Sequence, residues 1–121
     1  MIAMRPEQQA AFSAEAQRDF EARAAAFLRG EFPERFAEAS AADLLRFVRG
    51  SQDRAKSYGL TTEQAVVAVA CVRCHAGDDW SAAPWGWLEA TLRDADADPN
   101  DRAKLAAERA ESVALSRPEG G

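Results

Sequence analysis

Residues that favour β-strands are scarce in this chain. Val, Ile and Thr together number only 10 of 121 residues, too few for a sheet-based fold of ordinary composition. Alanine alone supplies 28 residues, and alanine with Arg, Glu, Gln and Leu favours helices. We therefore predict an all-α fold, a single compact domain over residues 1–121 with about five helices in an orthogonal or irregular bundle. Residues 6–116 form its expected ordered core, and residues 1–5 and 117–121 its frayed termini.

Apolar residues recur at three- and four-residue steps between about Pro6 and Arg29, which predicts the first helix. The stripe consists of Phe12, Ala16, Phe20, Ala24, Phe27 and Leu28. Gly30 suits the end of this helix, because glycine tolerates the left-handed conformation of a helix terminus. Phe32 and Phe36 then predict a single helical turn whose two rings dock on the core.

Ser40 and Asp43 have the spacing of a capping box, which predicts a second helix from Ala41 to Tyr58. Its expected inner face carries Leu44, Val48, Ser51, Ala55 and Tyr58. Tyr58-Gly59-Leu60 is typical of a helix terminator. Thr61 and Gln64 again have capping-box spacing, so a third helix over about 62–75 follows a short turn and must neighbour the second.

The third helix is apolar nearly all the way round, as a central helix would be, and Gly77 is expected to end it. A loop with three tryptophans leads into a fourth helix that continues through Leu88 and Leu92. Asp98-Pro99 predicts the start of a fifth helix, because an N-cap residue precedes a proline at the first helical position. The apolar and neighbouring residues of that helix are Leu105, Ala106, Arg109, Val113 and Leu115.

The negative charge of the chain is concentrated in one segment. The chain has 15 basic and 20 acidic residues, and residues 78–101 contain seven acidic residues and one basic residue, a net charge of −6. An acidic surface repels phosphates, so nucleic acid and anionic membranes are not expected partners. The apolar runs are shorter than a membrane span, and the first residues lack the apolar segment of a signal peptide. We therefore expect a cytoplasmic protein.

Cys71-Val72-Arg73-Cys74-His75 matches the C-x-x-C-H pattern of c-type haem attachment, in which two thiols bind the haem and the histidine binds its iron. No Met or His follows position 75 to serve as a sixth ligand, and no export signal precedes the motif. In the structural alternative, Cys71 and Cys74 are small buried residues and His75 caps a helix C-terminus. Zinc binding lacks a fourth ligand, and a redox couple lacks the preceding strand.

The segment from Asp94 to Asp101 resembles the opening of a calcium loop, with acidic residues at alternate positions. Pro99 stands where that loop needs glycine and Leu105 where it needs glutamate, so we predict no metal site. The alternative is a polar turn that caps the fifth helix. The three tryptophans leave two roles open: at least one is expected to seal the core, and the alternative for two of them, beside Asp78 and Asp79, is an exposed anchor for a partner.

The order of several short motifs resembles a group of small helical bacterial proteins encoded beside the spike and effector genes of type VI secretion systems. The motifs are Phe32-Pro33-Glu34, Tyr58-Gly59-Leu60-Thr61, Gly77-Asp78-Asp79 and Pro84-Trp85, and the resemblance covers about residues 28–110. The resemblance implies an accessory, adaptor or immunity role without a reaction or cofactor. This chain departs from the group at residues 71–75, where bulky aliphatic and aromatic residues are expected.

These observations predict a non-enzymatic protein that binds another protein, a secreted effector or toxin with a basic surface. The predicted contact residues are Asp78, Asp79, Trp80, Trp85, Trp87, Asp94, Asp96 and Asp98. An aromatic anchor surrounded by acidic residues would complement that surface. One alternative is a c-type haem electron carrier that uses Cys71, Cys74 and His75. Another is a structural subunit in which the apolar stripe of the first helix completes a homodimer.

Overall fold

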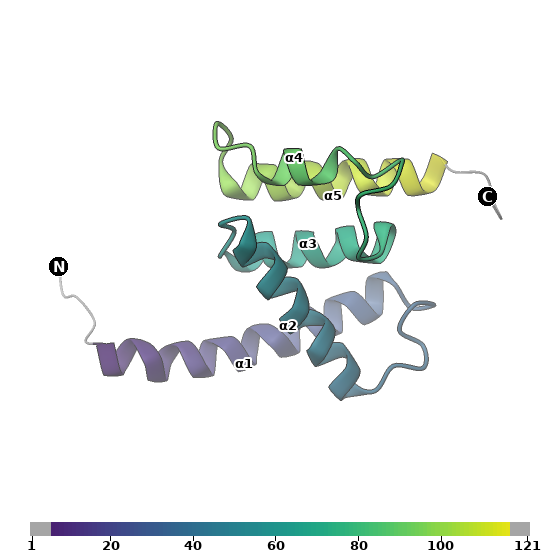
Figure 1. The fold of residues 1–121 in the computed structure, drawn as a ribbon. Helices are drawn as coiled ribbons and strands as arrows, with labels where there is room; N and C mark the ends of the chain where they lie inside the picture. Colours follow the sequence, from purple (N-terminus) through teal and green to yellow (C-terminus); the bar gives the residue numbers. More distant parts are fainter. Residues whose placement is uncertain (1–5, 117–121) are drawn as a thin grey trace. The chain divides into compact units, whose positions relative to one another are not determined.

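A computed structural model describes the backbone of residues 6–116 and the side chains of residues 14–116. This part of the chain forms five α-helices and no strand, which confirms the all-α class. The helices are α1 (Pro6–Glu31), α2 (Ala41–Ser57), α3 (Glu63–Ala76), α4 (Leu88–Leu92) and α5 (Pro99–Ser116) (Figure 1). The predicted frayed ends, 1–5 and 117–121, lie outside the described residues.

The chain divides into two compact units, residues 1–45 and residues 46–121. The division falls within α2, which runs without interruption from Ala41 to Ser57. No proline, glycine cluster or change of composition marks the position in the sequence. The residue pattern of α2 therefore does not indicate the division.

In the first unit, α1 extends past the predicted end at Gly30. The amide of Phe32 donates to the carbonyl of Leu28 at 2.8 Å, so the helical hydrogen bonds continue through Gly30, and the helix ends at Glu31. Pro33 follows, and its ring disfavours a helical conformation at the residue before it. The prediction that Gly30 terminates α1 is therefore wrong.

The inner face of α1 is formed by Phe20, Ala24 and Leu28, all of them buried. Phe27 was predicted in the same stripe, but 43% of its surface is exposed. It directly precedes Leu28, and neighbouring residues on a helix point about 100° apart, so both cannot face inward equally. The side chain of Phe12 lies outside the described residues.

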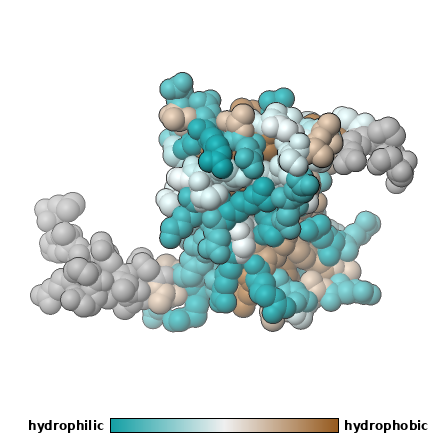
Figure 2. Space-filling view, viewed as in Figure 1, coloured by the Kyte–Doolittle hydropathy of each residue, from teal (hydrophilic) through white to brown (hydrophobic). Residues whose placement is uncertain are grey.

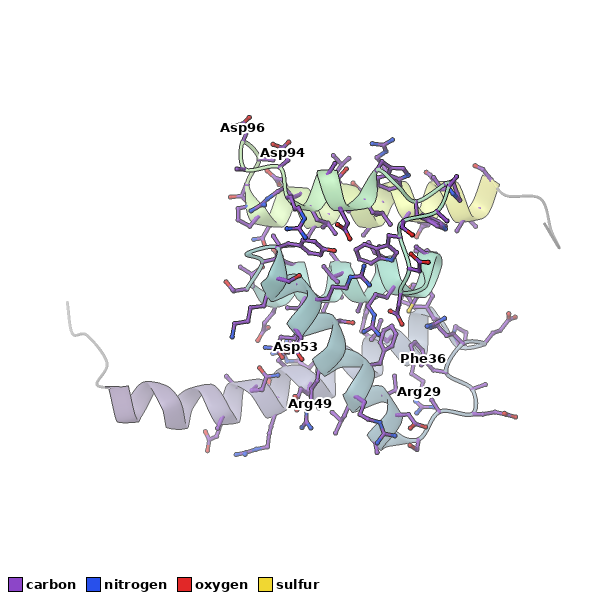
Figure 3. All side chains as sticks on the ribbon, viewed as in Figure 1. Arg29, Phe36, Arg49, Asp53, Asp94 and Asp96 are labelled. Atoms are coloured by element: carbon purple, nitrogen blue, oxygen red, sulfur yellow. The ribbon has the colours of Figure 1, made fainter. Side chains whose placement is uncertain are left out.

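The turn after α1 is held by hydrogen bonds from Arg29. Its guanidinium donates to the carbonyls of Phe36 at 3.1 Å and Ala39 at 3.0 Å (Figure 3). Phe36 is buried as predicted, whereas Phe32 is half-buried. The predicted capping box of α2 is confirmed at Ser40. Its hydroxyl accepts from the amide of Asp43 at 3.0 Å, and its own amide donates to the Asp43 carboxylate at 3.1 Å.

Helix α2 follows the predicted pattern closely. The five residues expected on its inner face are all buried: Leu44, Val48, Ser51, Ala55 and Tyr58. The predicted terminator is confirmed too, because Gly59 has a φ of 77° and the amide of Leu60 returns to the carbonyl of Ala55 at 2.9 Å. Leu60 is fully buried, so the side chain that follows the turn lies in the core.

The N-cap of α3 is one residue later than predicted. Thr62 has an extended backbone, and its hydroxyl oxygen accepts from the amide of Ala65 at 3.1 Å. The pairing of Thr61 with Gln64 is therefore wrong, since the cap lies at Thr62 and the helix begins at Glu63. No residue from Ala65 to Ala76 is exposed, which confirms a central helix, and Gly77 ends it with a φ of 74°.

Helices α3 and α5 pack against each other in the same direction, and α4 packs on α5 (Figure 1). The hydroxyl of Thr62 donates to the side-chain oxygen of Asn100, which joins the N-terminal ends of α3 and α5. The buried residues of α5 are alanines at positions 103, 106 and 110. Leu105 and Leu115, 49% and 79% exposed, are not part of this interface. Small side chains let two helices approach closely, which favours alanine there.

The predicted start of α5 is confirmed. The carboxylate of Asp98 accepts from the amide of Asn100 at 2.9 Å, and Pro99 is the first helical residue. Hydrophilic and near-neutral residues, teal and white, cover most of the visible face of α3, α4 and α5 (Figure 2). Within the described residues no helix is long and apolar enough to cross a membrane.

Candidate functional site

The first predicted contact residue, Asp78, is part of a hydrogen-bonded corner after α3. Arg73 donates through Nε to the carboxylate of Asp78 at 2.7 Å. Its Nη1 donates to the carbonyl of Phe47 at 2.9 Å and to the hydroxyl of Ser51 at 2.8 Å. The guanidinium also lies 4.1 Å from the centre of the Phe47 ring. Asp78 therefore helps to hold α2, α3 and the following loop together, although its carboxylate remains exposed.

Trp80 is a core residue. Only 3% of its surface is exposed, and its indole Nε1 donates to the carbonyl of Gly77 at 2.6 Å. Arg54 lies on one face of the indole at 3.5 Å, and Tyr58 stacks on it with ring centres 6.3 Å apart. Arg54 also donates to the carbonyl of Asp78 at 2.6 Å. Trp80 thus joins the loop after α3 to the end of α2.

The other two tryptophans differ in exposure. Trp85 is buried, whereas Trp87 is half-buried, and its Nε1 donates to the carbonyl of Pro84 at 2.7 Å. The guanidinium of Arg109, on α5, lies 4.4 Å from the centre of the Trp87 ring. The prediction that at least one indole seals the core is confirmed by Trp80 and Trp85. The expectation of two exposed indoles is wrong, since only Trp87 reaches the surface.

Asp79 is exposed and forms a local turn. Its carboxylate accepts hydrogen bonds from the hydroxyl of Ser81 at 2.6 Å and from the amide of Ser81 at 3.0 Å. These two hydrogen bonds stabilise the charged form and lower the pKa of the carboxyl group. Asp79 is therefore a fixed negative charge next to the Asp78 corner.

Asp94, Asp96 and Asp98 lie in the loop between α4 and α5, and we call residues 94–98 the acidic loop. Figure 3 labels Asp94 and Asp96 in this loop. The carboxylate of Asp94 accepts from the amide of Asp96 at 3.1 Å, and Asp98 caps α5. All three side chains are exposed. Among the described residues, no three His, Cys, Asp or Glu side chains are grouped so that they could hold a metal ion. The polar-turn alternative to a calcium loop fits this geometry.

The structure does not bring all predicted contact residues together. Asp78 and Asp79 follow the C-terminal end of α3, whereas the acidic loop precedes the N-terminal end of α5, which lies beside the N-terminal end of α3. Helix α3 has 14 residues, so its two ends are about 20 Å apart. The expected continuous surface is therefore two separate acidic regions.

The C-x-x-C-H residues lie in the second half of α3. Cys71, Cys74 and His75 are all half-buried, and neither cysteine is in a disulfide. Burial lowers the pKa of His75, and the nearby carboxylate of Glu111 on α5 partly opposes this shift. The histidine is therefore predominantly neutral at pH 7. Haem attachment stays the alternative function for these three residues.

Four arginines for which the sequence predicted no role organise the unit formed by residues 46–121. Arg54, Arg73, Arg93 and Arg109 each lie over an aromatic ring, and Arg93 lies 4.8 Å from the ring centre of Tyr58. All four pairs join segments that are distant in the chain, so the local spacing of residues gave no signal for any of them. No protein-family model, curated protein or solved structure matches this chain.

Proposed function

We propose that this chain is a non-enzymatic protein-binding module, an accessory, adaptor or immunity protein, whose acidic loop contacts a basic surface on its partner. The observation that carries the proposal is the exposure of Asp94, Asp96 and Asp98 on one five-residue loop. Two of these carboxylates hydrogen-bond the backbone of the loop and of the first turn of α5. Those bonds fix the loop in place and leave the charges facing solvent.

The second acidic region supports the same function with a smaller surface. Asp79 is exposed, and Trp87 offers part of an indole beside Arg109. Tryptophan and arginine are enriched among the residues that contribute most to protein interfaces. Trp80 and Trp85 are buried, so we assign them to the core. The partner contact thus rests mainly on charge, with Trp87 as its aromatic component.

Charge complementarity of this kind affects both the rate and the strength of association. An exposed ion pair contributes about 0.2–1 kcal/mol. Three such pairs amount to about 0.6–3 kcal/mol, which corresponds to roughly a 3- to 150-fold change in Kd. The resemblance to proteins encoded near type VI secretion genes suggests a secreted effector or toxin as the partner.

The test begins with affinity purification of the tagged protein from its own host, with identification of stoichiometric partners by mass spectrometry. Binding of the purified partner is then measured for the triple variant Asp94→Asn, Asp96→Asn, Asp98→Asn. Asparagine keeps the oxygen that accepts the loop hydrogen bonds, so this variant removes charge and preserves the turn. The matched control is the triple variant Glu31→Gln, Glu34→Gln, Glu38→Gln. It removes three exposed charges from the unit formed by residues 1–45.

We expect the acidic-loop variant to raise Kd by roughly 3- to 150-fold and to weaken its salt dependence. The control variant should bind nearly as the unmodified protein does. Equal effects of the two variants would show that net charge, and not the acidic loop, governs association. Unchanged binding by both would place the interface elsewhere.

A further inference from the structure

Cys71 and Cys74 lie one turn apart on α3 and have no role in the proposed function. Residues at this spacing share one face of a helix. With a helix radius of about 2.3 Å and a rise of about 1.5 Å per residue, their Cα atoms are about 5 Å apart. Cα atoms in disulfides are usually about 4.4–6.8 Å apart, so the backbone spacing permits a bond between these two thiols.

The side-chain spacing is less favourable. Cβ atoms at this helical spacing are about 5–6 Å apart, whereas a disulfide needs about 3.5–4.5 Å. A bond between the two sulfur atoms therefore requires the end of α3 to change shape by about 1 Å. Both side chains are half-buried, unlike the fully buried Val69 and Val72 of the same helix, so small reagents have partial access.

The segment that must change shape supports the following loop. The amide of Gly77 donates to the carbonyl of Arg73 at 2.8 Å, and Arg73 binds Asp78. The carbonyl of Gly77 accepts from the indole of Trp80 at 2.6 Å. Distortion of the last turn of α3 would be transmitted through these bonds to residues 77–80.

We propose that Cys71 and Cys74 form a reversible intramolecular disulfide that loosens the end of α3 and shifts the loop at residues 77–80. The oxidant is a small disulfide such as oxidised glutathione. One thiol loses its proton and attacks this disulfide, which releases one glutathione thiolate and leaves a mixed disulfide. The second thiolate attacks the protein sulfur and releases the other glutathione, and the released thiolates take up the two protons. A strained disulfide is easily reduced again.

The experiment equilibrates the full chain in glutathione mixtures of rising oxidised fraction and blocks the remaining thiols with an alkylating reagent. Mass spectrometry should find a monomer lighter by two hydrogen atoms, with no alkyl group and no glutathione. The tryptophan fluorescence, which includes Trp80, should change with the same midpoint and return on addition of dithiothreitol. The variants Cys71→Ser and Cys74→Ser should show no such fluorescence change.

Mixed disulfides with glutathione as the only product, or disulfide-linked dimers, would overturn the intramolecular bond. A bond that forms with unchanged fluorescence would overturn its coupling to the loop. Both results come from the unmodified chain, so they do not depend on whether the serine variants fold. No partner protein is needed, so the outcome is independent of the proposed function.

Discussion

Replacement of Gly50 with alanine should destabilise the unit formed by residues 46–121, although the same change usually stabilises a helix. Gly50 lies in the middle of α2. A Cβ atom at this position would lie 3.2 Å from Nη1 of Arg73 and 3.7 Å from its Cζ. The same Nη1 donates to the carbonyl of Phe47 and the hydroxyl of Ser51. The guanidinium is therefore held in tight contact with the position of the new methyl group and must shift by a few tenths of an ångström to admit it.

The expected magnitude follows from two opposing effects. Glycine in a helix interior costs about 0.5–1 kcal/mol relative to alanine, and the substitution recovers this amount. Hydrogen bonds from a charged donor contribute about 1.5–3 kcal/mol each, and a shift of Nη1 weakens two of them. A combined loss of about 2–3 kcal/mol leaves a net destabilisation of about 1–2 kcal/mol.

The assay is urea unfolding followed by tryptophan fluorescence, because all three tryptophans lie at positions 80–87 and report on this unit. The Gly50→Ala substitution is measured both in the unmodified protein and in the variant Arg73→Met, which removes the guanidinium and keeps an unbranched side chain. In that background Gly50→Ala should raise the free energy of unfolding by about 0.5–1 kcal/mol. Gly30→Ala is a further control, because a Cβ atom there meets nothing within 4 Å. Unfolding of the Gly30→Ala variant is followed by circular dichroism, because the tryptophans lie in the other unit.

The result that would refute this reasoning is equal stabilisation by Gly50→Ala in both backgrounds. It would mean that the guanidinium moves aside without loss and that its hydrogen bonds contribute little. A coupling free energy of about 2 kcal/mol between the two positions would instead confirm that α2 needs glycine where Arg73 crosses it.

Three further predictions test individual assignments. Thr62→Ala should lower the free energy of unfolding by about 1 kcal/mol, and Thr61→Ala by less than about 0.5 kcal/mol, in urea titrations; the reverse order would contradict the cap at Thr62. Because the folded-state pKa of His75 lies below 6.5, the unfolded chain binds its proton first as pH falls. The stabilising contribution of this group is then present above pH 6.5 and is lost as the pH falls from 6.5 through the lower folded-state pKa, so urea unfolding of His75→Gln should lack this component; identical pH profiles would contradict the burial. After co-expression with haem-attachment machinery, the protein should keep the mass of the bare chain; a haem adduct that is lost in Cys71→Ser would instead establish haem attachment at this motif and favour the electron-carrier alternative.

The helices were predictable from the sequence where short-range chemistry determines them. Ser40 and Asp43 cap α2 through bonds between residues three apart, and Gly59 with Leu60 ends it within one turn. The five buried residues of the inner face of α2 follow one another at steps of three or four, so the helical spacing in the sequence identifies the residues that are buried. The choice between Thr61 and Thr62 is harder. Both are threonines at a helix start, and only the backbone of Thr62 is oriented to accept from Ala65.

The interior of α5 was not predictable in the same way. Hydropathy favours Leu105 over its alanine neighbours, yet Ala103, Ala106 and Ala110 are buried and Leu105 is half exposed. The buried residues depend on how closely α3 approaches, and that distance is a property of the packed pair rather than of either helix. The same limit applies to Trp80, whose burial depends on Arg54 and Tyr58 from the end of α2.

The candidate surface depends on where the arginines lie. Residues 46–116 contain nine basic side chains, and among them Arg54, Arg73, Arg93 and Arg109 lie over the rings of Trp80, Phe47, Tyr58 and Trp87. An arginine held over a ring and bonded to backbone carbonyls, as Arg54 and Arg73 are, is directed towards the protein interior. The aspartates of the acidic loop have no such inward contacts and remain on the surface. The acidic loop therefore presents three exposed carboxylates, and the proposed preference for a basic partner depends on these charges.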